Sequence, residues 1–174
     1  MKSTTTNGLN YTGIVNLSQY TNHKKTPIAC IYNNGGNALF NFLSDCLVGD
    51  FDSARITRPT KIMLLNTEYD GENENKKVKK MSSASGFIYL ISKPEKVFVE
   101  STTAISKVRY SFVIARDTLE NATFNSIGLF ADNATLDDVV NFNYAAFCDI
   151  SLSTSDIAAS SLLAVDWELN ISNK

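Results

Sequence analysis

The sequence has few of the residues that most often build active sites and metal centres. Its 174 residues include one histidine, three cysteines and a single tryptophan. With one histidine and no Cys-x-x-Cys spacing, we expect no zinc site. His23 lies in polar sequence beside Lys24 and Lys25, where nothing would orient it as a general base, and we interpret it as a solvated side chain.

Long apolar runs and a strong charge of either sign are also missing. The net charge of −2 lacks the basic field that binds phosphates, so we expect no nucleic acid as the main partner. No apolar run is long enough to cross a bilayer, and residues 1–6 do not resemble a signal peptide. We therefore expect no membrane insertion. Cys30, Cys46 and Cys148 are odd in number and widely spaced, as in reduced core residues of a protein made in the cytoplasm.

The overall composition is typical of one globular domain. Hydrophobic residues make up 44% of the chain and charged residues 20%, and a chain of 174 residues can bury a substantial core. Residues 1–35 are rich in Asn, Thr and Tyr and have only short apolar patches. We predict that 1–35 is an extended N-terminal arm contributing little to the core, and that 36–174 is a single β-sandwich domain. Deleting 1–25 should then leave a folded core that no longer assembles.

One helix is predicted, at residues 37–48. Its apolar stripe has helical spacing and consists of Leu39, Phe40, Leu43, Cys46 and Leu47. Asn37 is placed to cap the helix and Gly49 to end it. We expect this helix to pack on a sheet.

Most of the remaining chain has the character of β-strands. Apolar and polar residues alternate in some segments, and others are short apolar runs typical of buried strands. The predicted strands lie at residues 60–66, 86–91, 107–114, 124–130, 144–152 and 165–171. The fold class that follows is mainly β: a two-layer antiparallel β-sandwich with one packed α-helix near 37–48.

Residues 68–80 are predicted to form a long exposed loop in which acidic residues precede basic ones. The charged residues are Glu68, Asp70, Glu72, Glu74, Lys76, Lys77, Lys79 and Lys80. Such a loop can dock against a symmetry-related copy, or it can be a solvated hairpin tip. Together with Tyr11, Tyr20 and Tyr32 of the arm, these residues are our candidates for inter-subunit contact.

The acidic pairs in the sequence have ordinary structural interpretations. Asp50/Asp52 and Asp137/Asp138 lie in turn-forming sequence, where Asp bonds to nearby backbone N–H groups. Asp166/Glu168 lies on the polar side of the last strand, and we interpret it as hydrated surface and not as a glycosidase dyad. Residues 132–137 lack the Gly and terminal Glu of a calcium loop and are interpreted as a turn. We predict no catalytic residue, no cofactor, no metal and no enzymatic activity.

Several short motifs carry a resemblance to a known group. They are Gly35-Gly36-Asn37 before the helix, Arg58-Pro59 before a strand, Phe-Asn-Ser-Ile-Gly-Leu-Phe-Ala at 124–131 and Leu-Ala-Val-Asp-Trp-Glu-Leu at 163–169. Over residues 30–172 this order resembles small β-rich virion structural proteins of tailed bacteriophages. The similar proteins are of the tail-collar and fibre-attachment type, or neck and head components of crAss-like phages.

The resemblance implies a structural function in the virion and a framework role for the matching residues. With the helix stripe, the framework residues are Leu39, Phe40, Leu43, Ile127, Gly128, Leu129, Phe130 and Trp167. The implied function is an oligomeric ring or collar in the neck or tail that attaches fibres. Its partners would be copies of itself and other virion proteins. Two alternatives stay open: a capsid decoration or head-fibre protein, and a carbohydrate-binding β-sandwich that recognises the host surface.

Overall fold

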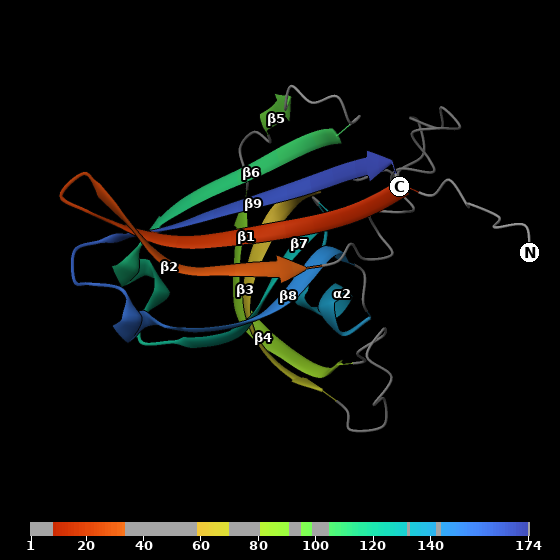
Figure 1. The fold of residues 1–174 in the computed structure, drawn as a ribbon. Helices are drawn as coiled ribbons and strands as arrows, with labels where there is room; N and C mark the ends of the chain where they lie inside the picture. Colours follow the sequence, from red (N-terminus) through yellow and green to blue (C-terminus); the bar gives the residue numbers. More distant parts are fainter. Residues whose placement is uncertain are drawn as a thin grey trace, which may run out of the picture.

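The protein folds into two antiparallel sheets packed face to face (Figure 1). The structure is a computed structural model that describes residues 9–33, 59–69, 81–90, 95–98, 105–131, 133–141 and 144–173. The five-stranded sheet has the order β2-β1-β9-β6-β5 and the four-stranded sheet the order β4-β3-β7-β8. The expected mainly β fold, an antiparallel β-sandwich, is confirmed.

The strands of each sheet come from distant parts of the chain. The first sheet contains β1 (Leu9–Thr21), β2 (Lys24–Asn33), β5 (Glu95–Phe98), β6 (Ile105–Ala115) and β9 (Leu162–Asn173). The second contains β3 (Pro59–Tyr69), β4 (Met81–Leu90), β7 (Thr123–Ala131) and β8 (Tyr144–Ser153). Each predicted strand overlaps one of these. Two short 3-10 turns, η1 (Arg116–Leu119) and η2 (Thr154–Asp156), connect the sheets.

The main core lies between the two sheets. Alternate residues of β9, such as Val165, Trp167 and Leu169, point inward and are buried, because successive side chains of a strand face opposite sides. Ile127 and Leu129 of β7 face them from the other sheet and are fully buried. Burying each such aliphatic side chain stabilises the fold by about 1.5–3 kcal/mol.

A second apolar cluster lies on the opposite side of the four-stranded sheet. It consists of Met63, Leu65, Met81, Phe130, Ala134 and Val139. On β3, Met63 and Leu65 belong to this cluster while Ile62 and Leu64 belong to the main core. This strand therefore contributes to apolar clusters on both faces, which accounts for its continuous apolar run.

The short helix α2 (Leu136–Val140) covers this second cluster with Val139. Thr135 caps it: the Thr135 backbone N–H donates to the Asp138 carboxylate at 2.6 Å, and the Thr135 hydroxyl donates to the same carboxylate at 3.0 Å. Our interpretation of 132–137 as a turn missed this helix, since five residues are too few to show a helical period. The helix predicted at 37–48 lies outside the described residues.

Residues 9–33 form a hairpin inside the five-stranded sheet. β1 lies between β2 and β9, and its Val15 and Leu17 are fully buried in the main core. Our expectation that residues 1–35 contribute little to the core is therefore corrected for this segment. The apolar residues of β1 alternate with polar ones, and pairing on both sides completes their burial.

The β1–β2 hairpin turns at Asn22 and His23. Both residues have positive φ, 49° and 65°, as the central residues of a type I′ turn do. His23 is exposed at this turn. Its position agrees with our interpretation of a solvated side chain.

Candidate functional site

The outer face of the five-stranded sheet carries a group of ion pairs and hydrogen bonds that join its strands. Opposite residues on antiparallel neighbours point to the same face, so the register defines rows across β2, β1, β9 and β6. The rows are Lys25–Tyr20–Leu162–Ala115, Pro27–Ser18–Ala164–Val113, Cys30–Asn16–Asp166–Ser111 and Tyr32–Ile14–Glu168–Arg109. Asp166 and Glu168 lie in the middle of these rows, on the strand between β1 and β6.

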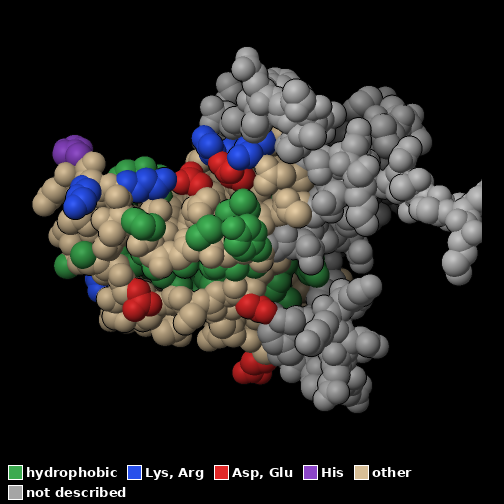
Figure 2. All heavy atoms as spheres, viewed as in Figure 1, with side chains coloured by type: hydrophobic (Ala, Val, Ile, Leu, Met, Phe, Trp, Pro, Cys, Tyr) green, Lys and Arg blue, Asp and Glu red, His purple; other side chains and the backbone are tan. Residues whose placement is uncertain are grey.

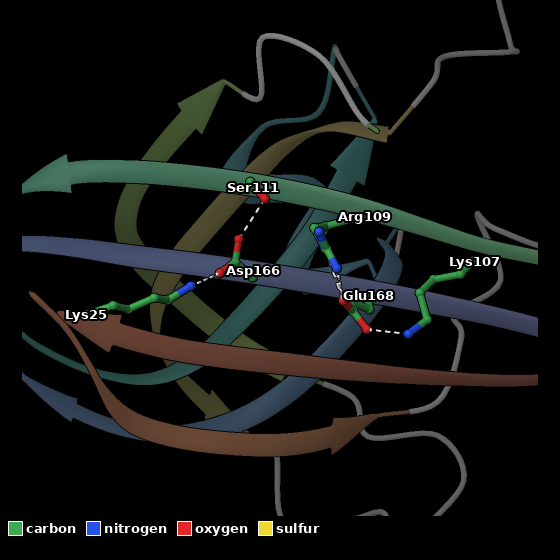
Figure 3. Close-up of polar contacts among 6 residues, drawn as sticks. All are labelled: Lys25, Lys107, Arg109, Ser111, Asp166 and Glu168. Carbon is green, nitrogen blue, oxygen red and sulfur yellow. Dashed lines mark hydrogen bonds and ion pairs between the residues drawn. The ribbon is translucent and has the colours of Figure 1, made fainter. Parts of the chain in front are cut away.

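Asp166 of β9 forms hydrogen bonds with residues of β2 and β6 (Figure 3). Lys25 Nζ of β2 donates to Asp166 Oδ2 at 2.6 Å. Ser111 Oγ of β6 donates to the other carboxylate oxygen, Oδ1, at 2.6 Å. A single carboxylate thus links three strands of the sheet.

Glu168 binds two cations of β6. Lys107 Nζ donates to Glu168 Oε2 at 2.8 Å. Arg109 donates to Oε1 through Nε at 3.0 Å and through one terminal nitrogen at 2.7 Å. These ion pairs bring together three cations, Lys25, Lys107 and Arg109, and two carboxylates, Asp166 and Glu168.

These contacts keep both carboxyl groups ionised. Burial would raise the pKa of Asp166, but the hydrogen bonds from Lys25 and Ser111 and the charges of Lys25 and Arg109 outweigh burial and lower it. The hydrogen bond from Lys107 is the main reason that the pKa of Glu168 is lowered, with Arg109 adding to it against the effect of burial. The hydrogen bond to Asp166 in turn raises the pKa of Lys25.

A hollow of about 670 Å³ lies over this face. Its lining consists of Asn16, Ser18, Lys25, Pro27, Ile28, Ala29, Cys30, Arg109, Ser111, Asp166 and Glu168. Short side chains such as Ser18 and Ser111 form part of this lining, while the longer Lys25 and Arg109 also border it. Figure 2 shows basic and acidic side chains close together on the surface of the molecule.

A β-bulge shapes one wall of the hollow. Leu17 pairs with Ala29 and Ser18 with Pro27, so Ile28 is an extra residue on β2. Pro27, Ile28 and Ala29 around this bulge border the hollow, and Ile28 and Ala29 also pack against the main core.

The two cysteines in the described residues differ in their surroundings. Cys30 is exposed and lines the hollow, whereas Cys148 is buried in the main core. Burial, with a smaller contribution from Asp149, raises the pKa of the Cys148 thiol to about 12, so it stays protonated at neutral pH. Cys46 lies outside the described residues.

Two of the three tyrosines that we predicted to contact another subunit, Tyr20 and Tyr32, lie on this face but not next to each other. Tyr20 lies beside Lys25, whose Nζ is 5.6 Å from the ring centroid, and Tyr32 is 75% exposed three rows away on the same face. Tyr11 belongs to β1, but the structure does not describe its side chain.

The charged-loop candidates fall mostly outside the described chain. Glu68 lies at the end of β3, is exposed and accepts a hydrogen bond from Ser83 of β4 at 3.2 Å. The other charged-loop candidates, Asp70, Glu72, Glu74, Lys76, Lys77, Lys79 and Lys80, lie outside the described residues.

The framework candidates that the structure describes are all buried. Ile127, Leu129, Phe130 and Trp167 are fully buried. A Cβ on Gly128 would overlap the ring of Phe130, so glycine makes room for that ring. Leu39, Phe40 and Leu43 lie outside the described residues.

Sequence reasoning identified the Asp166/Glu168 pair but not the residues that bind it. Lys25, Lys107 and Arg109 come from two other strands, and only the register brings them to the pair. In the sequence, the alternation of Lys107, Arg109 and Ser111 places these polar side chains on one face of β6, and this pattern could have indicated partners for the pair. We interpreted the pair as hydrated surface, whereas both carboxylates are partly buried and ion-paired, and these contacts lower both carboxyl pKa values.

Within the described residues, no group of three or more His, Cys, Asp or Glu side chains is placed to hold a metal ion. In the same part of the chain, no helix has the length and apolar character of a membrane span.

Comparison of the chain with protein-family models, curated proteins and solved structures found no match. The class that the fold defines is an antiparallel β-sandwich protein. Its candidate site is the charged and hollowed outer face of the five-stranded sheet.

Proposed function

We propose that this protein is a structural component of a tailed-bacteriophage virion that assembles as an oligomeric ring or collar in the neck or tail. It acts by binding other subunits and not by catalysis. The motifs at 124–131 and 163–169 support this proposal through their resemblance to such proteins. Both segments form central strands, β7 and β9, as framework motifs would.

The observation that carries the proposal is the set of exposed apolar side chains on one sheet face. Tyr32 is 75% exposed, Val113 52% and Leu162 42%, and they are the large apolar side chains that the described residues expose. The register places all three on the outer face of the five-stranded sheet. Apolar side chains gathered on one face favour a surface that another subunit covers.

Val113 and Leu162 lie close together on this face. Val113 is opposite Ala164, which is two residues from Leu162 on β9, so the two apolar side chains occupy adjacent rows. Tyr20 and Ala115 complete the row of Leu162. This end of the face, defined by Tyr20, Val113, Ala115 and Leu162, is our candidate subunit contact, and its burial in a closed ring would remove apolar surface from water.

Mass photometry over a concentration series tests the proposal. We expect wild-type protein to form one discrete high-order species. A Val113→Thr/Leu162→Gln double variant should shift the population towards monomer, because polar groups replace the apolar contact. Ser151→Thr, at an exposed position on the four-stranded sheet, is the matched control and should assemble as wild type does.

A wild-type protein that stays monomeric at every concentration would contradict self-assembly. Equal assembly by the double variant and wild type would contradict the assigned contact.

Two alternatives make different predictions. A capsid decoration or head-fibre protein would bind the outer capsid lattice as an isolated subunit. A carbohydrate-binding β-sandwich that recognises the host surface would bind glycans, and the hollow beside Asp166 and Glu168 is the observation that favours it.

A further inference from the structure

The hollow combines groups that only donate hydrogen bonds with groups that only accept them. The ionised carboxylates of Asp166 and Glu168 accept, and the ammonium of Lys25 and the guanidinium of Arg109 donate. The acceptor and donor atoms of each pair lie 2.6–3.0 Å apart. A ligand that contacts both members of a pair needs neighbouring atoms that can both give and receive hydrogen bonds. Vicinal hydroxyl groups have this property.

The Lys25–Asp166 pair leaves hydrogen-bonding capacity for a ligand. An ammonium has three N–H donors, and the bonds to Asp166 and Tyr20 use two of those of Lys25. A carboxylate has about four acceptor sites, and the bonds from Lys25 and Ser111 use two of those of Asp166. The pairs also hold these groups in fixed positions, which lowers the entropy cost of binding.

Charge balance on this face selects against a strongly charged ligand. Lys25, Lys107 and Arg109 face Asp166 and Glu168, and Glu95 of β5 is opposite Arg109 in the register, so positive and negative charges are close to balance. An anion would compete with the carboxylates for the cations, and a cation would compete with the cations for the carboxylates. A neutral polar ligand does not have to break either pair.

Pro27 gives the hollow an apolar patch on the side of β2, opposite Arg109 and Ser111 of β6. Such a patch suits a ligand that has a C–H face as well as hydroxyl groups. The volume of about 670 Å³ lies within the range of small-ligand sites, roughly 300–1,000 Å³.

We propose that this hollow is a saccharide-binding site in which neighbouring hydroxyls of a neutral sugar bridge the Lys25–Asp166 and Arg109–Glu168 pairs. The inference goes beyond assembly and gives the carbohydrate-binding alternative a specific site. The ring of the sugar packs on Pro27, and Asn16 lines the hollow beside it. Binding does not require the subunit contact at Val113 and Leu162.

The test is a glycan array of neutral and acidic bacterial oligosaccharides, followed by titration of the strongest-binding neutral glycan by NMR. We expect binding by wild type, with shifted amide signals from β2, β9 and β6. Asn16→Trp fills the hollow and should weaken binding by about tenfold or more. Thr12→Trp places the same side chain on the same face of β1, outside the hollow, and should bind as wild type.

Thermal unfolding of each variant checks that it is folded. If Asn16→Trp fails to fold, Ser111→Trp fills the hollow from an exposed position on β6. Raising NaCl from about 0.05 to about 0.5 M should change the affinity for a neutral glycan less than about twofold, since no net charge is paired.

Three results would overturn the inference. They are no binding to any neutral glycan, equal binding by wild type and the hollow-filling variant, and binding confined to acidic glycans that salt abolishes. Mass photometry of the same samples reports assembly separately, so a failure of the saccharide site is distinguishable from a failure of the ring.

Discussion

Glu168 shows at the scale of single residues how a surface carboxylate can fix the arrangement of a sheet. It accepts hydrogen bonds from Lys107 and Arg109, which stand two residues apart on β6. Its side chain is largely buried, and hydrogen bonds to a charged acceptor are stronger than those between neutral groups. The contribution to stability remains modest because the partners are partly exposed, about 1 kcal/mol for the cluster.

The lowered pKa of Glu168 predicts a pH-dependent effect of Glu168→Gln. A carboxyl group whose pKa is lower in the folded state than in the unfolded chain adds stability above its unfolded pKa. This contribution is lost as the pH falls from about the ordinary value, 4.5, through the lower folded value. We therefore expect Glu168→Gln to be less stable than wild type at pH 7 by about 1 kcal/mol, and the difference to shrink below about pH 4.

Urea unfolding at several pH values between 3 and 7 measures this difference. Glu120→Gln, at an exposed carboxylate at the end of η1, is the matched control. A difference between Glu168→Gln and wild type that stays the same at all pH values would contradict the assigned ion pairs.

At the scale of strands, Gly86 allows β4 to pair closely with β3. Gly86 is opposite Leu65 and has a φ of 156°. A Cβ at this position would overlap the backbone carbonyl of Leu64. A backbone atom cannot move aside as the end of a flexible side chain can, so the pairing of these strands requires glycine here.

We predict that Gly86→Ala destabilises the fold by about 2 kcal/mol or more, because the strands must separate locally. Thermal or urea unfolding measures the loss. Ser85→Ala, at the neighbouring exposed position of β4, is the control and should stay within about 0.5 kcal/mol of wild type. A Gly86→Ala protein as stable as this control would show that β3 and β4 do not approach as described.

At the scale of the whole molecule, β1 connects the N-terminal hairpin to the rest of the sandwich. It pairs with β2 on one side and with β9 on the other. From the sequence we expected the deletion of residues 1–25 to affect assembly alone. Because the deletion removes β1, it also affects the fold. It removes the strand that carries Val15 and Leu17 of the core.

We now predict that deletion of residues 1–25 abolishes cooperative unfolding, measured by circular dichroism during heating. Leu17→Ala is the finer variant and should cost about 2–5 kcal/mol, the usual cost of truncating a fully buried leucine. Thr12→Ala, exposed on the opposite face of the same strand, should change stability by less than about 0.5 kcal/mol. A truncated protein with a cooperative transition would restore the interpretation of this segment as an arm.

Local pattern predicted much of the fold. Alternation over 107–114, 144–152 and 165–171 placed β6, β8 and β9, since the period of two reports which face of a strand is buried. The same pattern in β1 is weaker because the segment has few apolar residues and Ile14 interrupts the alternation beside Val15. We therefore assigned it to an arm. The helix α2 was missed because its signal is a cap and one buried valine, not a period.

The candidate site could be predicted only in part. The spacing of Asp166 and Glu168 by two residues places both on one face of β9, and the sequence is sufficient for that. It does not indicate that Lys25, distant in the chain, donates to Asp166, or that Ile28 forms a bulge beside them. Such contacts depend on which strands are neighbours.

The sequence by itself determined the composition, the β periodicity and the faces of individual strands, because these depend on residues a few positions apart. The tertiary structure decided the strand order β2-β1-β9-β6-β5, the register of its rows and the hollow above them. These depend on pairing between segments far apart in the chain, such as β1 with β9. A shift of one residue in that register would send the charged side chains into the core, so burial of the alternate apolar residues fixes the site.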